Sequence, residues 1–137
     1  MAGALIAAWR LYKQTKSVIL FLVEDVTYNV CDQKFHEFEI RRQCPEVFVI
    51  RRTLTEIGTR GKLTDDKRLI IDGQEVGVIY MRCGYHPDQY PTGDNFYPFG
   101  ISQNKVSFIT NSRTVFIDCL KPNLSQDDLS LCMMIYF

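Results

Sequence analysis

The run SVILFLV, residues 17–23, constrains the fold more than any other stretch of the chain. It is continuously apolar and about as long as a strand, which indicates burial on both faces, as in a parallel sheet. Residues 30–43 then show helical spacing, and a second apolar run, residues 46–52, follows Pro45, which cannot extend a helix. We therefore expect a strand, helix, strand unit in which both strands are parallel and end at the same edge of one sheet.

The two helices expected in the first third of the chain both have an apolar stripe. At the amino end the residues at helical spacing are Ala2, Leu5, Ile6, Trp9 and Tyr12. In residues 30–43, Cys31, Phe35 and Phe38 share one stripe, which is the pattern of an amphipathic helix. We interpret Cys31, like Cys44, as a small core residue.

Two apolar runs on either side of Asp72-Gly73 predict a hairpin, because a tight primed turn needs residues that tolerate positive φ. The second arm, residues 76–81, is expected as a buried strand parallel to the first strand. The first arm is then antiparallel, and we expect it at the edge of the sheet, beside Lys67 and Arg68. The prediction is an α/β fold of three α/β/α layers with a mainly parallel, mixed, Rossmann-like sheet.

Composition argues against several classes of protein. The sixteen basic residues balance sixteen acidic ones, so we expect neither nucleic acid nor an anionic membrane as a partner. Five cysteines form no CxxC pair and suit neither a disulfide framework nor a zinc knuckle, which indicates a reducing compartment. The apolar amino end has no basic residue before it, and Arg10 interrupts it well short of a membrane span. We therefore expect a cytoplasmic protein without a targeting signal.

Several catalytic motifs are missing from the sequence. No GxGxxG follows the first strand and no GxxxxGK[ST] occurs, so the usual backbone cradles for nucleotide phosphates are absent. His36 and His86 lack the spacing of a metal site, and we interpret both as structural or solvated. Cys83 lies beside Arg82, which could lower the pKa of the thiol, but no base is evident to activate it. We expect no catalytic residue and no metal ligand.

Polar side chains gather where the chain leaves the expected carboxyl edge of the sheet. Asn29 can cap the helix with its side chain; alternatively, Asn29 and Gln33, on one helical face, grip a polar ligand together. Arg82 has the planar fork that suits a carboxylate, or it is a solvated charge at a strand end. Gly84 permits close backbone approach, and Tyr85 either joins the site or covers the core. Open α/β sheets bind ligands at this edge, so we expect a site for a carboxylate-bearing small molecule.

Six blocks of sequence are AAWRLY, VILFLVED, YNVCDQ, VFVIRRT, LIIDGQEVGVIYMRCGY and DQY. Together, in order and spacing, they resemble the substrate-binding domain of eukaryotic glutathione synthetase. The resemblance implies a sheet of pre-ATP-grasp type and an enzyme, homodimeric when full-length, that joins γ-glutamylcysteine to glycine with ATP and magnesium. The family's peptide-binding positions in an N-x-x-D-Q helix start are matched by Asn29 and Gln33. Those of an R-D-G-Y turn are matched by Arg82, Gly84 and Tyr85, so glutathione and its precursor are the expected ligands.

The sequence departs from the family at three points. Thr27 and Tyr28 replace a charged pair, Cys83 replaces the aspartate of R-D-G-Y, and nothing matches the glycine-rich ATP-grasp lid. We expect residues 1–90 to form part of the substrate-binding domain and residues 91–137 to be a tail unrelated to the family. The chain is then a fragment that binds no ATP or magnesium alone and does not catalyse ligation. A stand-alone glutathione-binding module and an inert fragment are the alternatives.

Overall fold

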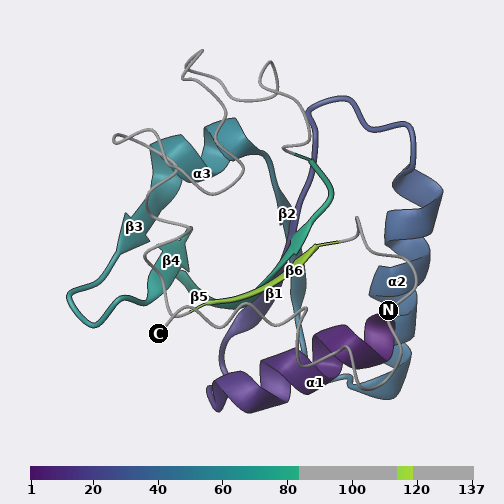
Figure 1. Cartoon of the computed structure of the whole chain (residues 1–137), viewed down its shortest axis with the longest axis horizontal. Helices are drawn as coiled ribbons and strands as arrows, with labels where there is room; N and C mark the ends of the chain where they lie inside the picture. Colours follow the sequence, from purple (N-terminus) through teal and green to yellow (C-terminus); the bar gives the residue numbers. More distant parts are fainter. Residues whose placement is uncertain (84–113, 119–137) are drawn as a thin grey trace.

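The computed structural model describes residues 1–83 and 114–118, the last four of them by backbone alone. Three helices and six strands form within these ranges (Figure 1). In chain order they are α1 (Ala2–Tyr12), β1 (Val18–Leu22), α2 (Val30–Gln43), β2 (Val49–Arg52), α3 (Leu54–Arg60), β3 (Gly61–Leu63), β4 (Leu69–Ile71), β5 (Gln74–Met81) and β6 (Val115–Asp118). None of the helices described is long and apolar enough to cross a membrane.

The described strands form one mixed sheet in the order β2-β1-β5-β4-β3, with β6 also beside β5. Strand β1 is parallel to both β2 and β5, and β6 is parallel to β5, which confirms the expected β1-α2-β2 unit. The hairpin between β4 and β5 is also confirmed, since Asp72 and Gly73 both have positive φ. The expectation that β4 forms the edge is wrong, because β3 pairs with its outer side from Gly61 to Leu63.

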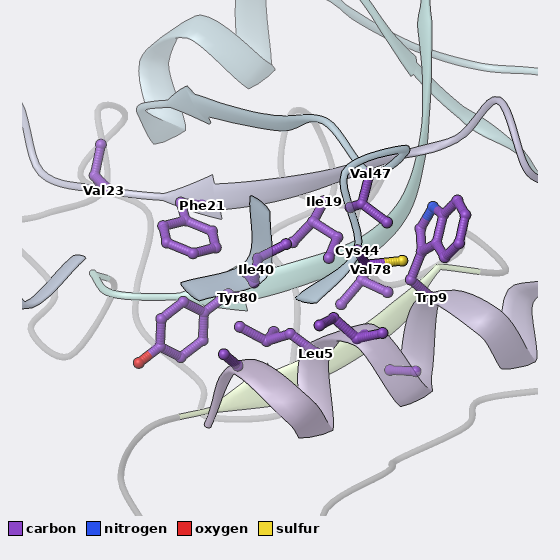
Figure 2. Packing of buried hydrophobic residues seen from close by; sticks show 13 residues of the cluster. Leu5, Trp9, Ile19, Phe21, Val23, Ile40, Cys44, Val47, Val78 and Tyr80 are labelled. Atoms are coloured by element: carbon purple, nitrogen blue, oxygen red, sulfur yellow. The ribbon is translucent and has the colours of Figure 1, made fainter. Parts of the chain in front are cut away.

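The sheet is covered on both faces, and each face has its own apolar cluster. Helices α1 and α2 cover one face, where Leu5 and Trp9 belong to one apolar cluster with residues of β1 and β5 (Figure 2). Helix α3 lies on the other face, and its two buried residues pack there with the alternate residues of β1. All five residues of β1 are buried, as the continuous apolar run predicts. The three-layer α/β fold is therefore confirmed.

A β-bulge at Gly77 changes which face of the sheet the residues before it occupy. The register with β1 shifts between Val18 and Ile19, which pair with Val76 and Val78 and so leave Gly77 as the extra residue. Val76 consequently joins one cluster and Val78 the other, although residues two apart in a regular strand share a face. A Cβ atom on Gly77 would lie 2.6 Å from Ser17 Oγ, so this close approach requires glycine.

Helix α2 does not bury the apolar stripe of Cys31, Phe35 and Phe38 that the sequence predicts would face the sheet. Phe35 and Phe38 are 66% and 58% exposed, and Cys31, which we expected in the core, is also exposed. The buried residues of this helix are instead Gln33, Glu37 and Ile40. Gln33 accepts a hydrogen bond from Arg51 of β2, a contact that the spacing within residues 30–43 cannot reveal, whereas Glu37 pairs mainly with Lys34 and Arg41 of its own helix. Cys44, the residue after the helix, is buried as expected.

Candidate functional site at the carboxyl edge

The ends of three parallel strands and the start of one helix meet at one edge of the sheet. Strands β1, β2 and β5 run in the same direction, and their last residues Leu22, Arg52 and Met81 lie in register. The loop after β1 leads into the amino end of α2, which packs on the face shared with α1 (Figure 1). The carboxyl edge of such a sheet is where α/β folds place ligand sites.

Gln33 is fully buried and is the centre of a hydrogen-bond network at this edge. Its side-chain oxygen Oε1 accepts from Arg51 Nη2 at 2.7 Å, so it ties α2 to β2. Its nitrogen Nε2 donates to Asn29 Oδ1 at 2.7 Å and to Thr27 Oγ at 3.0 Å. A buried amide with both ends paired is held in one orientation.

Asn29 occupies the N-cap position of α2, but its side chain makes no capping bond to a helix amide. Its Oδ1 atom accepts from Gln33 Nε2 and from the Thr27 hydroxyl, the latter at 2.8 Å. The interpretation of Asn29 as a capping side chain is therefore wrong. Asn29 and Gln33 lie on one helical face and bond each other, and the alternative that they grip a ligand together remains a prediction.

Arg82 follows β5 and reaches the same helix. Its Nη2 atom lies 2.9 Å from Asp32 Oδ2 in the first turn of α2, and Nη1 donates to the Tyr80 hydroxyl at 3.4 Å. The guanidinium also lies over the Tyr80 ring, 5.7 Å from its centre. The Arg82 side chain is 13% exposed, so it is not the solvated charge that we considered as an alternative.

The structure thus brings three of the five residues expected at the site to one place. Asp32 contacts Arg82 and immediately precedes Gln33 in α2. The start of α2 therefore lies beside the end of β5, as the topology predicts. Gly84 and Tyr85 lie outside the described residues. The part that any of the five plays in binding a substrate remains a prediction.

The sequence analysis did not include three residues of this edge among the expected site residues: Thr27, Asp32 and Arg51. Arg51 stands at the carboxyl end of β2, so the argument that selected Arg82 at the end of β5 applies to it equally. Asp32 lies between the two helix residues that were selected, and its pairing with Arg82 follows only from the fold. Thr27 was noted as a departure from the family, yet its hydroxyl links Asn29 and Gln33.

The titratable groups near the edge do not form a catalytic set among the described residues. Burial, with smaller contributions from Glu24 and Asp25, raises the pKa of Cys83 to about 12, so the thiol stays protonated. The idea that Arg82 lowers this pKa is wrong. Burial lowers the pKa of His36, whose ring packs 6.0 Å from that of Tyr80. His86 lies outside the described residues.

A magnesium site would need several oxygen ligands close together. In residues 1–83 and 114–118 no three His, Cys, Asp or Glu side chains are grouped so that they could hold a metal ion. The described residues therefore do not fit a resident metal.

Comparison with known proteins identifies the family. The model of the eukaryotic glutathione synthase family matches residues 17–97. Glutathione synthetase of Xenopus laevis is 42% identical over 87 residues, 64% of this chain and 18% of that protein. The Macaca fascicularis enzyme is 39% identical over 90 residues, 66% of this chain and 19% of its own length. A chloroplastic glutathione synthetase of Solanum lycopersicum is 42% identical over 89 residues, 65% of this chain and 16% of that protein. The matched stretch spans less than a fifth of each relative, and the chain belongs to the eukaryotic glutathione synthase family.

Proposed function

We propose that this chain carries part of the peptide-binding site of a glutathione synthase, at the edge formed by Asn29, Gln33 and Arg82. The observation that carries the proposal is the link from Gln33 and Asn29, through Asp32 of the same helix, to Arg82. Amide donors and a guanidinium on one edge suit a ligand with carboxylate and carbonyl oxygens. Gly84 and Tyr85 belong to the proposal through the family motif alone.

Arg82 is the residue that would hold a carboxylate of the peptide. Its side chain is 13% exposed, whereas that of Asp32, its present partner, is 49% exposed. The more exposed carboxylate loses less when it returns to water, so an incoming carboxylate would replace Asp32 on the guanidinium. The cation–π contact with Tyr80 keeps the guanidinium plane in place during this exchange.

The wider setting follows from the family. The complete enzyme would join γ-glutamylcysteine to glycine with ATP and magnesium and act as a homodimer, while this chain alone supplies peptide-binding groups and no ligase activity. A cytoplasmic location is part of the proposal, although plant relatives are named chloroplastic. The division into a family part, residues 1–90, and an unrelated tail, residues 91–137, is part of it as well.

Calorimetric titration of the purified chain with γ-glutamylcysteine and with glutathione tests the binding role. We expect weak, saturable binding that Arg82→Ala weakens roughly tenfold or more, because a hydrogen bond to a charged group is lost. Arg42→Ala is the matched control, since Arg42 lies at the far end of α2 and pairs with Glu39. If the unmodified chain binds neither peptide, the proposal fails and the chain is an inert fragment.

A separate assay tests the absence of ligase activity. The chain is incubated with ATP, magnesium, γ-glutamylcysteine and glycine, and released phosphate and glutathione are measured. We expect neither product above background. Formation of glutathione would show that residues outside the described ranges complete an active site, and would refute this part of the proposal.

A further inference from the structure

Arg51 fixes the direction of the hydrogen bonds at the carboxyl edge. A guanidinium can only donate, so the atom of Gln33 that lies 2.7 Å from Arg51 Nη2 must be the carbonyl oxygen. Gln33 is fully buried and cannot turn its amide toward water instead. Its NH2 group is therefore forced to face Asn29 and Thr27, where it makes two hydrogen bonds.

The orientation of the Gln33 amide in turn determines the orientation of the Asn29 amide. The NH2 group of Gln33 needs an acceptor, so Asn29 must present Oδ1 to it, and the Thr27 hydroxyl donates to that same oxygen. Both acceptor positions of the Asn29 oxygen are then in use. Asn29 is exposed, and within the described residues no acceptor is bonded to its Nδ2 atom. We call the series Arg51, Gln33, Asn29 the amide relay.

We propose that Arg51 is a positioning residue that orients the amide relay, so that Asn29 offers the ligand two N–H donors and selects a carboxylate or carbonyl oxygen. This inference rests on the proposed peptide-binding function and adds to it a residue that does not touch the ligand. If residue 51 were a hydrogen-bond acceptor, the side-chain amides of Gln33 and Asn29 would both turn over. Asn29 would then present its oxygen to the ligand, and that oxygen repels a carboxylate.

The placement of Arg51 suits this role. It lies in β2, where it pairs in register with Phe21 of β1, so its backbone is fixed by the sheet. Its Nε atom lies 3.9 Å from Glu37 Oε2, one turn along α2 from Gln33, which holds the guanidinium against the helix. The next residue, Arg52, projects to the opposite face and bonds Asp72 Oδ2 at 2.6 Å. Arg52 is therefore a control of the same type on the same strand.

The first test needs no ligand and follows the side-chain amide of Gln33 by NMR. In the unmodified chain we expect slow hydrogen exchange and contacts from this NH2 group to Thr27 and Asn29. Arg51→Met should speed the exchange roughly tenfold or more, since the bond from a charged donor is lost. Arg51→Lys keeps a donor and should restore most of the protection, whereas Arg52→Met should leave it unchanged within about twofold.

The second test is titration of the same variants with glutathione. Arg51→Met should weaken binding roughly tenfold, with Arg51→Lys and Arg52→Met close to the unmodified chain. If Arg51→Met leaves both exchange and affinity unchanged, or if a folded Arg51→Lys chain loses both, the inference is wrong while the proposed function stands. If the unmodified chain does not bind glutathione, the proposed function fails, and with it the selectivity we assign to Asn29. Should Arg51→Met not fold, the lysine variant alone decides the inference.

Discussion

Helices α1 and α2 cover the same face of the sheet, yet they are attached to it by different forces. Helix α1 buries Leu5, Ile6 and Trp9 and leaves Arg10 exposed. Helix α2 buries Gln33 and Glu37 and exposes Phe35 and Phe38. The first is held by removal of apolar surface from water, whereas the second adds to its one buried apolar residue, Ile40, polar contacts with Arg51 and Arg82.

The difference separates a part of the face that is packed for stability from the part to which we assign the proposed ligand contact. Buried amides and charges stabilise a fold less than well-packed apolar groups of the same size, but they hold donors and acceptors in fixed directions. A helix whose amino end presents Asn29 and pairs with Arg82 through Asp32 gains from such fixed directions.

Leu5→Ala in α1 should cost the most. Leu5 is fully buried in the cluster shared with β1 and β5, so its truncation leaves a cavity in the core. We expect a loss of about 2–5 kcal/mol in the free energy of unfolding, measured by chemical denaturation. A loss below about 1 kcal/mol would show that α1 is not held by apolar burial in the way we describe.

Gln33→Leu in α2 should cost less than the change in α1 and for a different reason. The leucine fits the site in size but leaves Arg51 Nη2 without its acceptor and the Asn29 oxygen with one donor, the Thr27 hydroxyl. We expect a loss of about 1–3 kcal/mol by the same measurement. Gln43→Leu is the control, because Gln43 is exposed at the other end of α2 and bonds Glu39. Equal losses in the free energy of unfolding would contradict the claim that the buried amide of Gln33 stabilises the fold more than the exposed amide of Gln43.

His36 should make the stability of the chain depend on pH. Burial lowers its pKa below the ordinary 6.5, and Arg82 and the amino terminus lower it further, although Asp32 opposes this. Between the folded pKa and 6.5 the unfolded chain binds more protons, so stability decreases as pH falls through this window and is highest above it. Denaturation curves at several pH values for the native chain and for His36→Gln check the sign. A difference between the two that increases as pH falls below 6.5, in favour of the native chain, would contradict it.

Phe38→Ser should have the smallest effect. The ring is 58% exposed, so a serine removes little buried apolar surface. We expect a change within about 0.5 kcal/mol in the free energy of unfolding. A loss as large as that for Leu5→Ala would mean that the ring is covered in solution, and that the contrast between the two helices is wrong.

The strands and helices that the sequence predicts well are those with a strong local signal. The continuous run of β1 predicts burial on both faces, and Asp72-Gly73 predicts the turn of the hairpin, because each depends on neighbouring residues alone. Strand β3 has three residues and no such signal, so the edge of the sheet was assigned wrongly. The orientation of α2 depends on Arg51, eighteen residues beyond Gln33, which no local pattern contains.

In the candidate site, too, the sequence predicts what depends on the order of strands and helices but not the pairing of distant side chains. Parallel strands end at one edge, which predicts that Arg82 and the start of α2 come close together. The topology does not predict which groups pair, so Asp32 and Arg51 were missed and Asn29 was considered as a capping residue. Pairing between side chains far apart in sequence depends on the completed fold.

We propose that the polar side of α2 and Arg82 bind a glutathione-type peptide. Titration of the ¹⁵N-labelled chain with glutathione, followed through side-chain resonances, tests it most directly. We predict saturable shifts at the Asn29 and Gln33 amides and at Arg82 Nε–H, with the Gln43 amide at the far end of the helix unchanged. Shifts that miss these three groups, or that occur equally at Gln43, would contradict the claim.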